Sequence, residues 1–347
     1  MDTKFSVSVV MATFNGGQFI AEQLDSIARQ THPPTELIVS DDASTDETIK
    51  IVRNFATTAP FPVKIVENEK RLGYGSNFLS ATKHASGAYL SFCDQDDVWL
   101  PNKIEVSLRA IEAFDGDLYV HGATIVDAIG TTGGQFTQGI RKRAVLAPLT
   151  LPPWGVFYGF SMVFRRDVFD IIPADDRGGH TFEFTGSLSH DLWIYFIASS
   201  LGRVIVDPQP LVLYRRHDKN ETPDLKGNIV RKISKFLGVA AHENLRRDSV
   251  AAHRSKILKD LAKSASPSRL RDQAGAASRY WAEIARFEAD RITFYTHDCI
   301  LSRLALCLKL LREGGYRSYR QGGLSWRLFM KDILFGVFQI RRRMAKN

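Results

Sequence analysis

Hydrophobic and polar positions follow two periods over the first 130 residues. Short apolar runs rich in β-branched residues predict strands within 5–13, 35–44, 62–69, 89–93 and 117–126. Between the first two runs, Ile20, Leu24, Ile27 and Ala28 recur at helical spacing. Strands that alternate with helices predict an α/β fold, with a mostly parallel sheet flanked by helices on both faces.

Capping and turn residues locate several helix ends. Ser44 and Glu47 have the spacing of a capping box and predict a helix that runs through Phe55. Residues 77–84 predict another helix, and Pro101 suits the first turn of the helix after the fourth strand.

The remainder of the chain changes character twice. Residues 131–153 have the composition of a loop, 187–200 predict a helix and 203–217 predict a pair of strands. Beyond about residue 226 the pattern is helical and basic. Residues 226–347 contain 26 Lys+Arg and 10 Asp+Glu, whereas residues 1–225 contain 20 and 28. We therefore expect an α/β domain over 1–225 and a basic helical extension over 226–347.

Three predicted strands end in polar or acidic side chains. They are Thr13 with Asn15, Asp41 with Asp42, and Asp94 with Asp96 and Asp97. The carboxyl ends of parallel strands meet at one edge of a sheet, where α/β proteins bind their ligands. Carboxylate oxygens suit Mg²⁺ or Mn²⁺, which also bind substrate phosphates. A single Asp-x-Asp would be explained by a solvated loop or a helix cap, but three such strand ends favour a ligand site.

Other sequence features exclude several classes of protein. The segment ATFNGGQFI has only the pair Gly16–Gly17, so a dinucleotide-binding fingerprint is missing, and there is no P-loop motif. No window of about 18 apolar residues predicts a membrane-spanning helix. The start of the chain is unlike a signal peptide, and the three cysteines suit reduced thiols. We therefore expect a cytoplasmic location.

Four segments in order resemble the family-2 inverting glycosyltransferases with the GT-A fold. They are VSVVMATFNGGQFIAEQLDSI, ELIVSDDASTDET, NEKRLGYGSNF and YLSFCDQDDVWLPNKI. SHDLW and YRRH further along are similar to the bacterial rhamnosyltransferase-like branch, which builds surface polysaccharides. The resemblance covers about residues 5–220. It supports the reaction better than the substrate, because one fold hosts many acceptors.

The resemblance implies a sugar donor linked to a nucleoside diphosphate, and it implies roles for individual residues. The positions that match donor nucleotide-binding residues are Thr13, Asn15, Asp41, Asp42, Gly73, Asn77 and Asp94, and Arg71 lies in a matching segment. Asp94, Asp96 and His217 match metal-binding positions for Mg²⁺ or Mn²⁺. Asp191 matches the catalytic base that takes the proton of the acceptor hydroxyl. Strand-end capping, helix-start acids and a structural histidine are the plain alternatives.

A last group consists of candidates for contact with the sugar, the acceptor or the phosphates. Its members are Asp97, Trp99, Trp154, Trp193, Arg215 and Arg216, with Phe157 and Tyr158 as further parts of an acceptor wall. The aromatic residues of the group suit the hydrophobic core equally well, and the two arginines suit a solvated face.

The basic C-terminal region has three interpretations. Residues 324–340 combine leucines, isoleucines and phenylalanines with Arg327 and Lys331, and the cluster 341–343 follows. A basic amphipathic helix can lie on an anionic membrane, pack on the catalytic domain or form a homodimer. Nucleic acid is disfavoured as a partner, because no nucleic-acid motif is present and the N-terminal part is acidic.

The sequence thus predicts a metal-dependent inverting glycosyltransferase. The favoured donor is dTDP-rhamnose, and the favoured acceptor is a growing surface glycan, lipid-linked, at the inner face of the cell membrane. Two alternatives stay open at this point. One is a sugar nucleotidyltransferase, which usually has a glycine-rich loop with a basic residue after the first strand. The other is an inactive homologue that binds glycan or acts as a scaffold.

Overall fold

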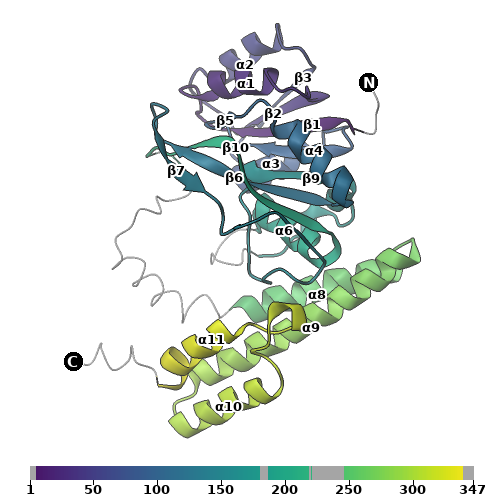
Figure 1. Ribbon diagram of the computed structural model, residues 1–347, viewed down its shortest axis with the longest axis vertical. Helices are drawn as coiled ribbons and strands as arrows, with labels where there is room; N and C mark the ends of the chain where they lie inside the picture. The colour runs from purple at the N-terminus through teal and green to yellow at the C-terminus, as the bar shows by residue number, and fades with distance from the viewer. Residues whose placement is uncertain (1–4, 180–186, 219, 221–245, 339–347) are drawn as a thin grey trace, which may run out of the picture.

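The computed structural model describes residues 5–179, 187–218, 220 and 246–338. Its N-terminal part is built on one large sheet, and its C-terminal part is helical (Figure 1). Strand order in the sheet is β3-β2-β1-β4-β9-β6-β10-β5, with β7 beside β6 and β8 beside β10. The strands are β1 (Val7–Thr13), β2 (Glu36–Asp41), β3 (Val63–Glu67), β4 (Tyr89–Cys93), β5 (Val98–Trp99), β6 (Leu118–Val126), β7 (Thr132–Phe136), β8 (Ala144–Leu146), β9 (Met162–Arg165) and β10 (Val204–Arg215).

The sheet is parallel where the chain first builds it. Strands β1, β2, β3 and β4 pair in parallel, and β10 is parallel to β6. Strand β9 joins the two groups because it is antiparallel to both β4 and β6. The predicted mostly parallel sheet flanked by helices is therefore confirmed, with antiparallel strands added on its C-terminal side.

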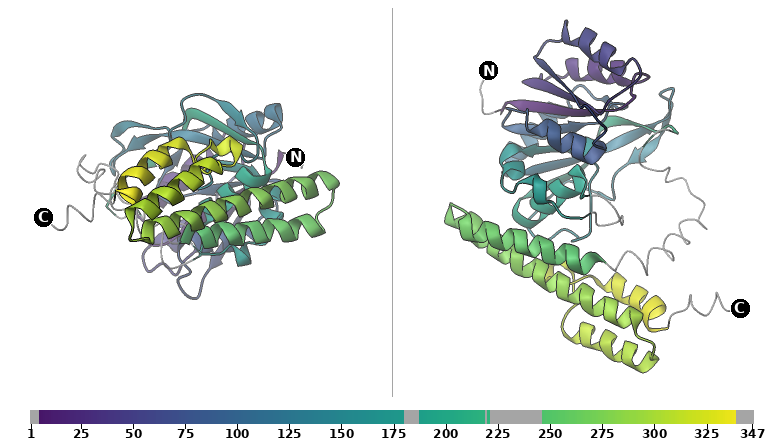
Figure 2. Two further views of the ribbon diagram at one scale, coloured as in Figure 1. Left: turned by 90° about the horizontal axis from the view of Figure 1, so that it is seen from below. Right: turned by 180° about the vertical axis from the view of Figure 1, so that it is seen from behind.

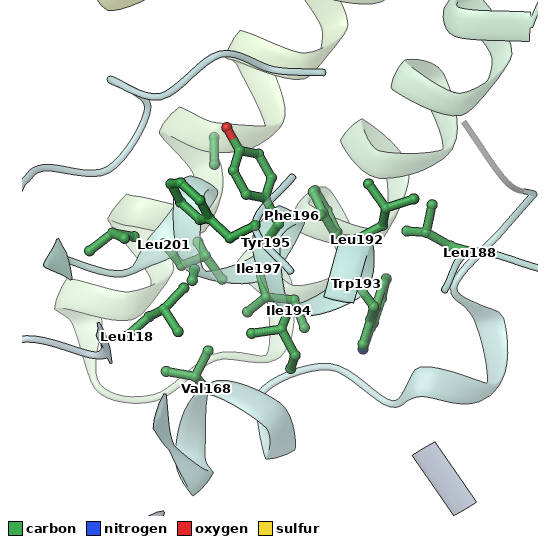
Figure 3. Close-up of a cluster of buried hydrophobic side chains, with 14 of the residues drawn as sticks. Leu118, Val168, Leu188, Leu192, Trp193, Ile194, Tyr195, Phe196, Ile197 and Leu201 are labelled. Atoms are coloured by element: carbon green, nitrogen blue, oxygen red, sulfur yellow. The ribbon is translucent and has the colours of Figure 1, made fainter. Parts of the chain in front are cut away.

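Helices cover both faces of the sheet because the buried strand residues alternate between them. Val7, Val9 and Met11 of β1 pack in the hydrophobic cluster that contains α1 (Ile20–Ala28), α2 (Thr48–Ala56) and α4 (Lys103–Phe114). Val10 points into the opposite cluster with α3 (Tyr74–Thr82), α5 (Arg166–Asp170) and α6 (His190–Leu201). Helix α6 is buried on almost all sides, and Figure 3 shows its aromatic and aliphatic side chains in that core.

Several predicted element boundaries are wrong. Strands β7 and β8 lie in the segment predicted as a loop, and one strand, β10, with two register irregularities replaces the predicted strand pair. Helix α3 begins at Tyr74, three residues earlier than predicted. Pro101 precedes α4 and is not part of its first turn.

The predicted capping box is also wrong. The hydroxyl of Ser44 donates to Asp41 at 2.6 Å and makes no cap for α2. The amide of Thr48, at the start of α2, instead donates to Asp46 at 3.0 Å.

The C-terminal part is a helical hairpin with two shorter helices at one end. It consists of α8 (Arg247–Ser264), α9 (Ser268–Thr296), α10 (Ile300–Arg312) and α11 (Trp326–Lys331), followed by a π-helical turn, Asp332–Val337. Figure 2 shows the long hairpin lying beneath the sheet domain, with α10 and α11 at the end remote from the α8–α9 turn. No helix in the described ranges is long and apolar enough to span a membrane.

The hairpin packs on the sheet domain through α6 and the segment before β9. Trp281 of α9 donates to the hydroxyl of Ser200 at 2.9 Å, and Trp154 donates to Glu288 of α9 at 2.7 Å. The guanidinium of Arg254 lies near the rings of Trp154, Phe196 and Trp281, at 4.6 to 5.3 Å from their centroids. Helices α8 and α9 of the basic region therefore pack on the sheet domain.

Candidate active site

A cavity of about 500 Å³ lies at the carboxyl ends of the strands. It is bounded by the loop after β1, the start of α3, the loop after β4, the start of α6 and the end of β10. The lining residues that carry polar or aromatic groups include Thr13, Asn15, Asp42, Arg71, Asn77, Asp94, Gln95, Asp96, Tyr158, His190, Asp191, Tyr214, His217 and Asn220. Segments more than 200 residues apart in the sequence thus form one site.

Carboxylates crowd one wall of this cavity. The pKa of Asp94 is raised to about 7, first by burial and then by the neighbouring charges of Asp96 and Asp191. Mutual repulsion of this kind shows that the carboxylate after β4 and the one at the start of α6 face the same space. Such a wall is suited to a cation and to proton transfer.

Asp96 is held by two side chains from the end of β10. Its Oδ2 atom lies 2.8 Å from His217 Nε2 and accepts a hydrogen bond from Asn220 Nδ2 at 3.0 Å. The ring of Phe19 packs against His217, with centroids 4.7 Å apart. The group combines carboxylate, imidazole and amide donors, which suit Mn²⁺ or Mg²⁺.

The residues present fit a divalent cation in chemistry, without forming a closed metal cage. Within the described ranges, no cluster of three or more His, Cys, Asp or Glu side chains is arranged to hold a metal ion. The pKa of Asp94 is raised first by burial and then by the charges of Asp96 and Asp191, which outweigh the opposing charge of Lys103. Such cations often take part of their ligands from substrate phosphates, and an open carboxylate wall is compatible with binding of this kind.

Beneath the acidic wall lies a buried lysine that sequence analysis missed. Lys103 of α4 donates to the carbonyl oxygen of Phe160 at 2.6 Å and lies 3.7 Å from the centroid of the Trp99 ring. Burial lowers the pKa of Lys103 to about 7. Its charge in turn opposes the rise in the pKa of Asp94 and Asp97. No motif marks this residue, because the fold alone brings α4 under the loop after β4.

The opposite wall is a network that holds the loops after β1 and β2. Asp41 accepts hydrogen bonds from the Thr13 hydroxyl at 2.7 Å and from the Ser44 amide at 2.7 Å. Asp42 accepts from the amides of Leu72 and Gly73 at 2.6 and 2.8 Å. Gly73 has a φ of 81°, a conformation that glycine adopts without strain. Asp42 thus fixes the loop that leads into α3, whereas Asp41 ties the end of β1 to the loop after β2.

A second bridge joins the loops after β1 and β4. Gln95, between the two aspartates, accepts from the Phe14 amide and donates to the Phe14 carbonyl, both at 3.0 Å. The guanidinium of Arg71 lies 4.0 Å from the centroid of the Phe14 ring, on the cavity side. A flat aromatic ring beside a cation at the cavity edge suits a nucleotide base and its phosphates.

Asp191 occupies the first turn of α6, where the helix dipole favours a carboxylate. Its Oδ1 atom accepts hydrogen bonds from the Ser189 hydroxyl and, at 2.8 Å, from the Leu192 amide. These bonds fix the side chain on the cavity wall. Beside it, burial lowers the pKa of His190 to about 4, and the neutral ring stacks on Phe78 with centroids 4.1 Å apart.

Comparison with known proteins agrees with this geometry. Residues 8–172 match the model of glycosyl transferase family 2. Over these residues, the chain belongs to glycosyl transferase family 2. The predicted resemblance is therefore confirmed for the glycosyltransferase domain.

The relatives of the glycosyltransferase domain have names that refer to different sugar donors or to none. The chain is 26% identical over 219 residues to an uncharacterized glycosyltransferase of Nostoc sp., and the matched part is 62% of this chain and 66% of that protein. It is 26% identical to the dTDP-rhamnosyl transferase RfbG of Shigella flexneri, over 61% of this chain and 73% of RfbG. It is 34% identical over 104 residues to WfgD of Escherichia coli, named a UDP-Glc:alpha-D-GlcNAc-diphosphoundecaprenol beta-1,3-glucosyltransferase, over 30% of this chain and 40% of WfgD.

A solved structure resembles almost the whole chain. S. aureus TarS 1–349 in complex with UDP superimposes with a TM-score of 0.51 at 16% sequence identity, over 93% of this chain and 91% of that one. At this identity the likeness supports the fold alone. The chain spans about two thirds or less of the length of the first curated relatives that it matches, 66% of one and 59% of others.

Ten of the residues predicted for the site line the cavity. They are Thr13, Asn15, Asp42, Arg71, Asn77, Asp94, Asp96, Tyr158, Asp191 and His217. The side-chain amide of Asn77 is engaged with the Ser40 carbonyl, and Asn15 accepts from the Thr45 amide at 2.8 Å. Their direct contact with a donor stays a prediction.

The prediction of ligand contacts is wrong for Trp99 and Trp193, and for Trp154 it stays a prediction. Trp99 is 2% exposed and Trp193 is 0% exposed, and Figure 3 shows Trp193 in the core around α6. Trp154 lies in the interface with α9, where its indole nitrogen binds Glu288. Indole faces as buried as those of Trp99 and Trp193 cannot stack on a sugar, and the half-buried Trp154 does not line the cavity.

Arg215, Asp41, Asp97 and Gly73 also lie away from the cavity surface. The guanidinium of Arg215 is engaged with Glu22 and with two backbone carbonyls, so a contact with phosphate is wrong for this residue. Asp97 is 1% exposed and accepts from the Arg215 amide at 3.0 Å. Asp41 orders the loop after β2 through Thr13 and Ser44, and the Gly73 amide orders the loop before α3 through Asp42. Arg216 donates to the Tyr214 hydroxyl at 2.7 Å, and its contact with phosphate stays a prediction.

Several lining residues were missed at the sequence level. Gln95 and Asn220 both carry amides next to predicted metal ligands, in DQD and in HDKN, and this proximity was the available signal. Phe14 and Tyr214 read as ordinary strand-end aromatics, and only the fold shows that they border the cavity.

Proposed function

We propose that the chain transfers a sugar from a nucleoside-diphosphate donor to a hydroxyl group of a glycan, with inversion at the anomeric carbon. The observation that carries the proposal is the placement of Asp94, Asp96 and Asp191 on one cavity wall. Inversion requires a base on one side of the sugar and charge stabilisation at the leaving group on the other. On this wall, Asp191 is placed to act as the base, and Asp94 with Asp96 is placed to stabilise the leaving group through a cation.

Asp191 is proposed as the base. Its Oδ1 atom is fixed by Ser189 and the Leu192 amide, so the carboxylate keeps one orientation. Within the described ranges, no hydrogen bond reaches Oδ2, which leaves that oxygen to accept the proton of the acceptor hydroxyl. Attack by the hydroxyl oxygen then forms the new glycosidic bond while the bond to the diphosphate breaks.

Asp94 and Asp96 are proposed to hold Mg²⁺ or Mn²⁺, with His217 and Asn220 at hand to complete the site. When bound, the cation would neutralise the diphosphate leaving group. Arg71, beside the Phe14 ring on the cavity wall, supplies positive charge at the nucleotide end.

The donor and the acceptor follow from the relatives' names only as proposals. The rhamnosyl transferase of Shigella flexneri supports dTDP-rhamnose, whereas WfgD supports UDP-glucose and a diphosphoundecaprenol-linked acceptor. We propose dTDP-rhamnose as the donor and a lipid-linked surface glycan as the acceptor, at the inner face of the membrane.

Calorimetry and turnover together test the proposal. UDP, dTDP, GDP and CDP would be titrated with Mn²⁺ or Mg²⁺, with EDTA, and against Asp96→Ala. We expect cation-dependent binding of one diphosphate, and its loss in the variant. Binding of none of them would refute the donor site and favour a glycan-binding scaffold.

Asp191→Asn then separates catalysis from binding. A general base contributes about 10² to 10⁴ in rate, so donor hydrolysis or transfer should fall by at least about 10² while donor affinity is kept. Asp175→Asn is the matched control, because its carboxylate is 83% exposed and outside the cavity. Release of pyrophosphate from a nucleoside triphosphate and a sugar phosphate would instead identify a nucleotidyltransferase.

A further inference from the structure

The exposed apolar surface of the described chain is concentrated in one place. Nine of its fifteen exposed large hydrophobic side chains lie between residues 300 and 338. They are Ile300, Leu301, Leu304, Leu308, Leu311, Trp326, Met330, Leu334 and Phe338. A patch of this kind on a soluble protein marks an interaction surface.

Helix α10 has the reverse of an ordinary surface pattern. Leu301, Leu304, Leu308 and Leu311 recur every three or four residues, so they share one face, and this face is exposed. Leu301 is 72% exposed. The opposite face is buried and contains a charged residue, Arg303, whose guanidinium binds the carbonyl oxygens of Val337, His297 and Asp298. A helix with exposed leucines on one face and a buried arginine on the other is expected to bind a partner through its exposed face.

A second apolar stripe begins on α11. Trp326, Met330, Leu334 and Phe338 recur every four residues and are all exposed. Arg303 of α10 binds the carbonyl of Val337, so the two stripes flank the same junction. Figures 1 and 2 show both helices at the same end of the α8–α9 hairpin. Part of the segment predicted as one amphipathic helix, including Leu324 and Val337, is buried instead, and the cluster 341–343 lies outside the described residues.

Charge decides which partner fits these stripes. Residues 299–338 contain seven Lys+Arg and two Asp+Glu. Partners within the protein engage both acids and two of the basic residues. Asp332 is buried against Arg291, and Glu313 pairs with Arg286. Arg303 is buried against backbone carbonyls, and Lys309 pairs with Asp290. Residues 339–347 add four basic residues and no acidic one. The apolar stripes therefore lie in a strongly basic setting.

We propose that the outer faces of α10 and α11 form a docking surface for an anionic lipid bilayer, with their leucines and Trp326 in the interfacial layer. Apolar side chains rimmed by Lys and Arg are the chemistry that binds anionic headgroups. A second copy of this chain is a poorer partner, because it would place two basic surfaces against each other. The inference goes beyond the proposed reaction, since binding of lipid requires no catalysis.

Sedimentation with vesicles tests the docking surface in the full chain. Phosphatidylcholine vesicles with and without phosphatidylglycerol would be compared at low and high salt. We expect binding to the anionic vesicles only, weakened by salt. Leu304→Gln/Leu308→Gln should reduce the partition by roughly tenfold or more, because both side chains would enter the bilayer. The matched control is Ile129→Gln, an exposed residue in the turn between β6 and β7 (88% exposed).

Fluorescence supplies a second readout. Trp99, Trp193 and Trp281 are at most 2% exposed, whereas Trp326 is 58% exposed. Anionic vesicles should therefore shift the emission to the blue through Trp326, and Trp326→Phe should remove the shift.

Three results would overturn the inference. The first is that the protein binds neutral and anionic vesicles equally well, or binds neither kind. The second is that Leu304→Gln/Leu308→Gln binds anionic vesicles as well as the unchanged protein does. The third is a dimer in solution that Leu304→Gln/Leu308→Gln dissociates without an effect on lipid binding, which would assign the surface to a second copy. Circular dichroism and thermal unfolding of each variant would show that folding is unchanged.

Discussion

Substitution of Arg291 tests whether a buried ionic cluster holds the helical region together. Arg291 of α9 is fully buried, and its guanidinium donates to both oxygens of Asp332 at 2.7 and 2.8 Å and to Glu288. The hydroxyls of Tyr295 and Tyr316 also donate to Asp332. Glu288 in turn accepts from Trp154 of the glycosyltransferase domain. The cluster thus connects the C-terminal helices with each other and with the sheet domain.

The expected cost follows from the burial of these groups. Arg291→Met removes an arginine that binds two carboxylates, those of Glu288 and Asp332, whose side chains are 0% exposed. Loss of one partner from a buried ion pair costs about 3–5 kcal/mol, because the remaining charge is uncompensated. Arg286→Met on the same helix is the matched control. Its pair with Glu313 is 49% and 32% exposed, so its removal should cost no more than about 1 kcal/mol.

Urea unfolding followed by the fluorescence of the buried Trp281 measures both variants. We expect a lower urea midpoint for Arg291→Met and a nearly unchanged midpoint for Arg286→Met. Arg291→Lys should have an intermediate midpoint, because lysine keeps the positive charge but cannot form the bidentate hydrogen bonds of a guanidinium. Similar losses in Arg291→Met and Arg286→Met would refute the argument that burial of the cluster determines its contribution.

Three further predictions concern the cavity. Burial and then the neighbouring carboxylates raise the pKa of Asp94 to about 7, so in EDTA stability should fall as the pH rises from about 4 through about 7. Differential scanning fluorimetry should show this slope, to which Asp97 also contributes because burial raises its pKa; an equally steep slope in Asp94→Asn would contradict the assignment. Asp42→Ala removes the acceptor of two loop amides, so it should cost about 1.5–3 kcal/mol and expose residues 68–73 to limited proteolysis, with an unchanged cleavage pattern as the contrary result. A Cβ on Gly159 would lie 2.5 Å from His190 Nε2, so Gly159→Ala should cost about 1–3 kcal/mol in thermal unfolding, and the same loss in Gly133→Ala, where the nearest atom is 3.6 Å away, would argue against crowding.

The strands were predictable where they are buried on both faces. The strand predicted at 89–93 has the same bounds in the structure, because a continuous apolar run of that length has no other stable place. Strand β7 was missed because most of its residues are exposed and two are glycines, so no alternation marks it. Its pairing with β6 is decided by backbone hydrogen bonds that leave no pattern of side chains.

The candidate site shows the same division. The acids at the strand ends predicted the wall that Asp94 and Asp96 form, since the ends of parallel strands share an edge. Arg215 was predicted as a candidate for contact with phosphate. In the structure its guanidinium reaches Glu22, which is 193 residues away in the sequence. Partners at such separations are fixed by packing, which no local motif records.

The sequence by itself determined the order of strands and helices over about the first 126 residues, the family, and the edge of the sheet at which polar groups collect. These depend on periodicity and on short motifs, which are local properties of the chain. Only the tertiary structure decided which aromatic rings face the cavity and which are core, that Lys103 lies beneath the carboxylates, and that α10 turns its leucines outward. The physical reason is that burial and electrostatic environment depend on every element packed around a side chain, whereas the local sequence specifies only the element on which that side chain lies.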